Sequence, residues 1–100
     1  MNKNKDLIII ETFNLAVKNH QKNNLKEAQE LYVKILKIDP KYINAHNNLG
    51  LLFHNNGDYQ KAIDCFEKVI EINPNNLGSY NNLGNIFKKL GENQKAIDCY

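Results

Sequence analysis

The chain has 100 residues, of which 42% are hydrophobic and 24% charged, so it can form one small domain with its own core. Lysine and arginine together number 13 against 11 acidic residues, and the resulting net charge of +2 is too small to favour a surface for nucleic acid. The longest apolar run near the start, Leu7 to Ile10, is too short for a membrane span, and we expect neither a membrane partner nor a signal peptide.

A repeat of 34 residues runs through the sequence. Gln60–Cys65 recur letter for letter as Gln94–Cys99, and Asn47–Gly50 recur as Asn81–Gly84. We therefore expect a single array over residues 1–100. Its copies are residues 9–42, 43–76 and 77–100, of which the third is truncated.

Each copy is predicted to contain two helices, because its apolar residues recur every three or four positions in two blocks. In the first copy the dipeptide Asn23-Asn24 separates the two blocks. Asn24, followed three residues later by Glu27, predicts a capping box at the start of the second helix.

The second copy has the clearest helix boundaries. Its first helix is predicted over the apolar residues from 43 to 53, and Asn55-Asn56-Gly57 ends it. Asp58 is the predicted N-cap of a second helix, which Asn73-Pro74 stops. Gly91 marks the same turn in the third copy.

Small residues recur where the two helices of a copy should lie closest, because helix axes about 8–10 Å apart need small side chains at the contact. These residues are Ala16, Gly50 and Gly84 in the first helices and Ala28, Ala62 and Ala96 in the second. A glycine inside a helix costs about 1 kcal/mol relative to alanine, so we predict a close packing contact at Gly50 and Gly84.

The repeated positions as a set resemble the tetratricopeptide repeat. They are Leu-Gly at the seventh and eighth positions, Phe53 and Phe87 at the eleventh, the alanines at the twentieth, Tyr32, Phe66 and Tyr100 at the twenty-fourth, and Pro40 and Pro74 at the thirty-second. The resemblance covers Ile9 to Tyr100. It implies an all-α fold, a right-handed α-solenoid of antiparallel helix pairs whose first helices line a concave surface. The first copy departs from the pattern at Thr12 and Asn19, which predicts weaker packing of its first helix.

By position, the resemblance assigns a peptide-binding role to polar residues of the first helices. The candidate residues are Asn14, Asn48, Asn82, Asn47, Asn81, Leu51, Asn85, His20, His54 and Lys88. Asn14, Asn48 and Asn82 occupy one site in each copy, and similar rows of asparagine line the superhelix of tetratricopeptide-bearing O-linked sugar transferases. A carboxamide carries donors and an acceptor, so such a row can bind both N–H and C=O of an extended peptide. A solvated helix face explains the same row in a chain with 18 asparagines, and both interpretations stay open.

Other chemistry finds little support in the sequence. His20 and His54 lack a third ligand, so no metal site is expected, while a pH-sensitive surface and plain surface imidazoles both remain open. Cys65 and Cys99 lie on successive second helices and are expected to be free, half-buried thiols. Two cysteines without metal-binding spacing favour a reducing, cytoplasmic compartment. No nucleophile with a base and no phosphate loop is present, so we expect no catalytic residue, no cofactor and no enzyme activity within these residues.

The sequence therefore predicts a non-catalytic scaffold module that binds a protein or an extended peptide on its concave surface. A chaperone-tail carboxylate clamp is not expected, because only Asn48 matches its residues. Two alternatives follow from the third copy, which stops at Tyr100 midway through its second helix. The chain is then either the substrate-docking arm of a larger glycosyl- or sulfotransferase, or it self-associates through an uncapped C-terminal helix.

Overall fold

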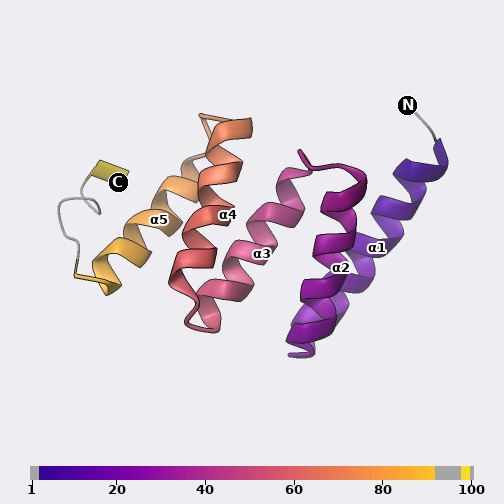
Figure 1. The fold of residues 1–100 in the computed structure, drawn as a ribbon, viewed down its shortest axis with the longest axis horizontal. Coiled ribbons are helices and arrows are strands. Elements are labelled where there is room, and N and C mark those ends of the chain that lie inside the picture. The colour runs from indigo at the N-terminus through magenta and orange to yellow at the C-terminus, as the bar shows by residue number, and fades with distance from the viewer. Residues whose placement is uncertain (1–2, 92–97, 100) are drawn as a thin grey trace.

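The computed structural model describes residues 3–91 and 98–99, and within these ranges the secondary structure is helical, without a strand. The helices are α1 (Lys3–Gln21), α2 (Leu25–Ile38), α3 (Ile43–Asn55), α4 (Tyr59–Ile72) and α5 (Leu77–Lys89). They stand side by side in a row, with α1 and α5 at opposite ends (Figure 1). The molecule is accordingly elongated, with extents of 45 × 29 × 16 Å. The predicted all-α fold of antiparallel helix pairs is confirmed.

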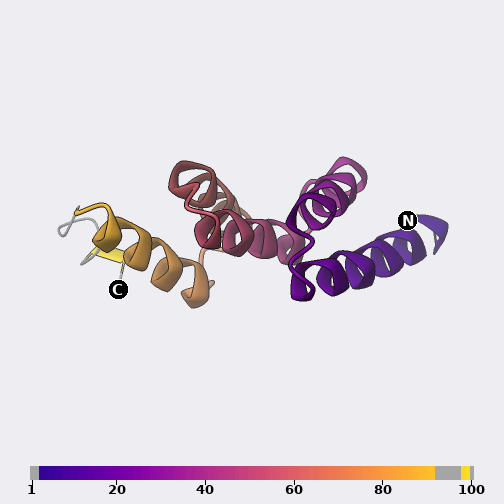
Figure 2. The ribbon, with the colours of Figure 1, turned by 90° about the horizontal axis from the view of Figure 1, so that it is seen from below.

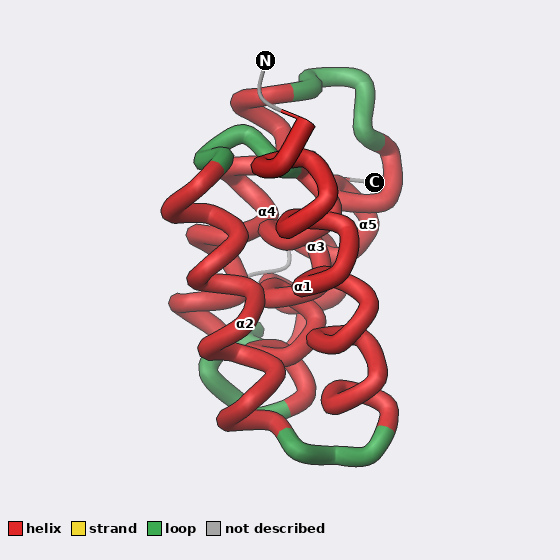
Figure 3. Tube along the Cα trace, turned by 90° about the vertical axis from the view of Figure 1, so that its right-hand side faces the viewer, coloured by secondary structure: helices red, strands yellow, loops and turns green. Residues whose placement is uncertain are grey.

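The helices form two layers. Seen from below, α1, α3 and α5 lie on one side and α2 and α4 on the other (Figure 2). We call the first of these the α1–α3–α5 layer. Helix α2 contacts both α1 and α3, and α4 contacts both α3 and α5. Viewed along the row, the helix pairs stack behind one another and the turns lie at the two ends (Figure 3).

The core lies between the two layers. Apolar residues of α2 and α4 recur at helical spacing and face the first helices, which gives both helices one buried side. The fully buried large side chains include Tyr32 and Ile35 from α2, Phe66 and Val69 from α4, Leu52 from α3 and Ile86 from α5. Because the buried side chains come from successive helices, the core is continuous along the row.

The turn between the helices of a repeat has one backbone geometry in all three copies. Asn23, Gly57 and Gly91 occupy the same repeat position and have φ values of 65°, 83° and 79°. This left-handed conformation closes a helix and favours glycine or asparagine. The predicted helix ends at residues 55–57 and 73–74 are confirmed by α3 and α4.

The predicted capping box at Asn24 is wrong. Asn24 precedes α2, yet its side chain makes no cap hydrogen bond, and its Nδ2 donates to Asn19 Oδ1 at 3.2 Å instead. Asp58 precedes α4 in the same way and accepts from Asn56 Nδ2 at 3.3 Å. Both residues have ψ near 70°, outside the extended region that N-cap residues typically adopt. Asn76, with ψ of 93°, does cap α5.

The predicted close helix contact at Gly50 is confirmed, because Phe66 lies directly against it. Ala16, Ala28 and Ala62 are fully buried, and Gly84 is buried too. Ala96, and with it most of the helix that should face Gly84, lies outside the described residues.

The first helix is less well covered than its equivalents. Leu15 is 50% exposed, whereas Leu49 and Leu83 at the same repeat position are 4% and 5% exposed. Helices α2 and α4 pack on α3 and α5 respectively, and no described helix covers the corresponding side of α1. The exposure of Leu15 thus has another cause than Thr12, which is buried, and the weaker packing that the sequence predicts from Thr12 and Asn19 stays a prediction.

Candidate functional site

The structure brings three polar side chains together at the junction of the first two repeats. The Tyr32 hydroxyl lies 3.3 Å from His20 Nδ1 and accepts a hydrogen bond from Asn48 Nδ2, also at 3.3 Å. The three residues belong to α2, α1 and α3, so the contact joins both layers and both repeats. We call this group the junction triad. His20 and Asn48 are predicted site residues, whereas Tyr32 is not.

Aromatic rings surround the junction triad. Phe13 packs against Tyr32 with ring centroids 6.0 Å apart and against Tyr42 at 5.7 Å. The His20 imidazole meets the Tyr32 ring edge-on at 6.0 Å. Burial raises the pKa of the Tyr32 phenol, and the hydrogen bond from Asn48 partly opposes that shift. Tyr32 therefore keeps its proton and can donate as well as accept.

A second polar contact joins the second and third repeats. Lys89 Nζ lies 3.2 Å from His54 Nε2, and the ring of Tyr59 packs against His54 at a centroid distance of 5.7 Å. Partial burial lowers the pKa of His54, and the charge of Lys89 lowers it further. Neutral imidazole accepts the ammonium hydrogen here, so this junction carries a positive charge on Lys89, next to the exposed Lys88.

The three repeat-equivalent asparagines have different surroundings. Asn14 is exposed, Asn48 is half-buried and bonded to Tyr32, and Asn82 is half-buried. The repeat position that Tyr32 occupies next to Asn48 is held by Phe66 in the following repeat, and phenylalanine has no hydroxyl. The row is therefore not a set of three identical sites.

The remaining predicted site residues are spread along the α1–α3–α5 layer. Asn47 and Leu51 are half-buried on α3, and Asn81, Asn85 and Lys88 are exposed on α5. The structure does not gather them around one point. Sequence reasoning missed Tyr32, although one signal was present: its repeat equivalent Phe66 shows that the packing position does not need a hydroxyl.

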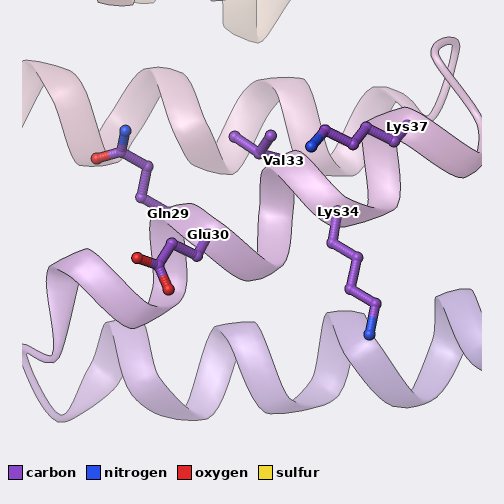
Figure 4. Close-up of a pocket in the computed structure, with 5 residues that line it drawn as sticks. All are labelled: Gln29, Glu30, Val33, Lys34 and Lys37. Carbon is purple, nitrogen blue, oxygen red and sulfur yellow. The ribbon is translucent and has the colours of Figure 1, made fainter.

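A shallow hollow of about 380 Å³ lies on the outer side of α2. Gln29, Glu30, Val33, Lys34 and Lys37 line it. Their side chains do not converge: Gln29 and Lys34 point in opposite directions (Figure 4). A small-molecule site needs polar groups aimed at a common position, so this hollow does not qualify as one.

Metal and thiol chemistry can be assessed over the described part of the chain. No three residues among its His, Cys, Asp and Glu gather in a way that could hold a metal ion. None of the described helices combines the length and the apolar character needed to cross a membrane. Cys65 and Cys99 are free and half-buried, as predicted. Burial, and then the charge of Asp64, raise the pKa of the Cys65 thiol to about 11.

Family models identify the repeat. A model described as a tetratricopeptide repeat matches residues 43–76, a second one so described matches residues 65–98, and a model described as a TPR repeat matches residues 19–57. The chain belongs to the tetratricopeptide repeat family. No curated protein matches the sequence of this tetratricopeptide repeat protein.

Solved structures agree with this assignment of the fold. The chain superimposes on the crystal structure of MamA with a TM-score of 0.88 at 23% identity, covering 91% of this chain and 53% of the MamA chain. It superimposes on the N-terminal domain of stress-induced protein-1 (STI-1) from C. elegans with a TM-score of 0.88 at 19% identity, covering 99% of this chain and 83% of that domain. The tetratricopeptide array described here thus spans about half the length of MamA. Family and fold together support a protein-interaction scaffold.

Proposed function

We propose that this chain is a non-catalytic interaction module that binds an extended segment of a partner protein on the surface of its α1–α3–α5 layer. The observation that carries the proposal is the junction triad, which fixes a histidine and an asparagine from neighbouring helices beside a cluster of aromatic rings. Side chains whose rotamers are held by neighbours lose less entropy when a ligand binds.

The chemical character of the layer fits a peptide better than a small molecule. At the first junction Phe13 packs against both Tyr42 and Tyr32, and the Tyr32 hydroxyl accepts from the amide of Asn48. At the second junction Lys89 and Lys88 supply positive charge. A surface of this kind can hold apolar side chains, backbone amides and an acidic group of one extended chain at separate points.

Asn14, Asn48 and Asn82 are the proposed backbone contacts along this surface. The test begins with a displayed library of random 12-residue peptides, from which one peptide is selected on the native chain. Its dissociation constant is then measured for the native chain and for the triple variant Asn14→Ala, Asn48→Ala, Asn82→Ala. Three net hydrogen-bond energies near 1 kcal/mol each predict a loss of roughly a hundredfold.

Asn75→Ala is the matched control, because Asn75 is exposed in the turn between α4 and α5 and lies outside the proposed surface. It should leave the dissociation constant unchanged. Unchanged binding in the triple variant, with both variants folded by circular dichroism, would remove the asparagines from the interaction.

A further inference from the structure

We infer that Tyr32 is a positioning residue. It orients the carboxamide of Asn48 and the imidazole of His20 so that both hydrogen-bond to one stretch of the main chain of a bound peptide. This inference rests on the proposed function, since it names how the same surface recognises its peptide. The central observation is that one buried hydroxyl contacts both side chains, each at 3.3 Å.

The direction of the hydrogen bonds follows from the groups involved. Asn48 Nδ2 donates to the Tyr32 oxygen, and a phenol has one proton of its own to donate. The phenol oxygen could accept a second hydrogen bond from His20 Nδ1, but its own proton would then have no acceptor among the described residues, so we assign His20 Nδ1 as the acceptor of that proton. An imidazole that accepts at Nδ1 carries its hydrogen at Nε2 when it is neutral. Tyr32 thus selects the Nε2–H tautomer of His20.

The same bond fixes which polar atom Asn48 offers to a ligand. Its Nδ2 is held by Tyr32, and among the described residues no hydrogen bond engages its Oδ1. The carboxamide is half-buried, while the Tyr32 ring that holds it is fully buried and cannot follow a ligand outward. Asn48 therefore offers an acceptor, Oδ1, and His20 offers a donor, Nε2–H.

An extended peptide carries the complementary pair on its main chain. Its N–H groups donate and its C=O groups accept, at intervals that do not depend on the side chains. We assign an N–H of the bound segment to Asn48 Oδ1 and a C=O to His20 Nε2–H. Recognition at this junction is therefore by backbone, and it tolerates different side chains.

The junction of the second and third repeats lacks this arrangement of side chains. His54 and Asn82 are the repeat equivalents of His20 and Asn48, but Phe66 stands at the position of Tyr32. His54 contacts Lys89 instead. The pair of acceptor and donor that Tyr32 orients is thus specific to the first junction, and the asparagines of the row are not interchangeable.

The first test needs no ligand. The tautomer of His20 is read from two-bond proton–nitrogen correlations of the imidazole at about pH 8, where a free imidazole is neutral. We expect Nε2 protonated and Nδ1 unprotonated in the native chain. Tyr32→Phe should shift this balance, whereas Tyr59→Phe, which removes a hydroxyl from the ring beside His54, should not move the His20 signals. Equal tautomer populations in the native chain and in Tyr32→Phe would overturn the inference.

The second test uses the 12-residue peptide selected on the native chain. Each N–H of that peptide is replaced in turn by N-methyl, and the position whose methylation weakens binding most is identified. In the native chain the loss there should be roughly fivefold or more. In Tyr32→Phe and in Asn48→Ala the same methylation should have little further effect, because both variants lose the acceptor that Asn48 offers to that N–H.

The outcomes separate this inference from the proposed function. If peptide binding is weakened by Asn48→Ala but not by Tyr32→Phe, the positioning role of Tyr32 is overturned, while the proposed peptide surface stays in place. Indifference to the triple asparagine variant would overturn the proposed surface itself, although the tautomer experiment would still report on Tyr32. Phenylalanine occupies the equivalent buried position in the second repeat, so Tyr32→Phe is expected to fold, and Asn48→Ala supplies an independent variant.

Discussion

The ring of Phe66 lies directly against the backbone of Gly50. A Cβ atom placed at Gly50 would stand 2.7 Å from Cε1 and Cζ of Phe66, closer than a real Cβ contact. Phe66 is fully buried, so its ring has no open space into which it can move. In the first repeat the same two positions hold Ala16 and Tyr32, and there a methyl group is accommodated.

Replacing Gly50 with alanine is therefore expected to destabilise the protein. Alanine gains about 1 kcal/mol in helix propensity over glycine, but overpacking a filled core costs typically about 1–3 kcal/mol, and this contact is one of severe overlap. Gly50→Ala should lower the free energy of unfolding by about 1–2 kcal/mol. Urea unfolding followed by circular dichroism measures the change.

Gly78→Ala is the matched control for this prediction. A Cβ atom at Gly78 would meet only Asn76 Oδ1, at an ordinary 3.5 Å. The control should leave stability unchanged or raise it by up to about 1 kcal/mol. If both alanine variants raised stability equally, the packing argument at Gly50 would be wrong.

Ser79 places a hydroxyl in the core, and the described residues offer this hydroxyl no hydrogen-bond partner. The residue is fully buried in α5, and within the described structure its Oγ forms no hydrogen bond. Ala45 occupies the same repeat position and is fully buried as well. Ser79→Ala should raise the free energy of unfolding by about 1 kcal/mol, because it removes an unsatisfied polar atom. The cap of α5 is retained, since Asn76 Oδ1 accepts from the backbone N–H of Ser79.

Thermal unfolding of Ser79→Ala measures this effect. The reverse substitution at the equivalent repeat position, Ala45→Ser, tests the same argument with the opposite sign. Ala45→Ser should lower stability by about 1–3 kcal/mol. A lower melting temperature for Ser79→Ala would show that the hydroxyl finds a partner in solution.

His54 makes the stability of the protein depend on pH. Burial and the charge of Lys89 lower the pKa of His54, so near this pKa the unfolded chain binds more protons than the folded one. The stability linked to His54 is therefore fully present above the ordinary histidine pKa of about 6.5 and is lost as the pH falls through the lower folded value. Acidification should destabilise the native chain more than it destabilises His54→Gln.

Urea unfolding midpoints at about pH 5 and pH 7.5 test this pH dependence. They are measured for the native chain and for His54→Gln, so that the contributions of the other titrating groups cancel in the difference. Lys89→Gln keeps the imidazole and removes the neighbouring charge, so nuclear magnetic resonance should show a higher His54 pKa in that variant. A His54→Gln chain with the same pH dependence as the native protein would count against this assignment.

The repeat explains why so much of the fold follows from the sequence. Helix ends at Gly57 and Pro74 depend on backbone conformations that few residues adopt. The left-handed turn recurs at Asn23, Gly57 and Gly91, and the proline recurs at Pro40 and Pro74. The contact at Gly50 is also predictable, because glycine inside a helix needs a packing reason. Whether the side chain of Asn24 caps α2 cannot be predicted in the same way, because capping depends on a ψ angle that the residue type does not determine.

The site could be predicted only in outline. Repeat position places His20 and Asn48 near one another, but it does not show that Tyr32 joins them, because the twenty-fourth position is a core position in the repeat pattern. The contact between His54 and Lys89 spans 35 residues and depends on the conformation of a long side chain. Spacing along a sequence carries no information on such a conformation.

The thiol of Cys65 should be unusually slow to react. Burial, and then the charge of Asp64, raise its pKa to about 11, so only about one molecule in a thousand carries the thiolate at pH 8, against roughly a quarter for an ordinary cysteine. A thiolate of higher pKa is intrinsically more nucleophilic, which recovers part of this loss and leaves alkylation roughly tenfold to twentyfold slower than for a free cysteine. Iodoacetamide labelling followed by peptide mass spectrometry measures the rate at Cys65, and the same reaction in guanidinium should proceed at the ordinary rate. Labelling of folded Cys65 as fast as in guanidinium would show that α4 does not shield the thiol in solution.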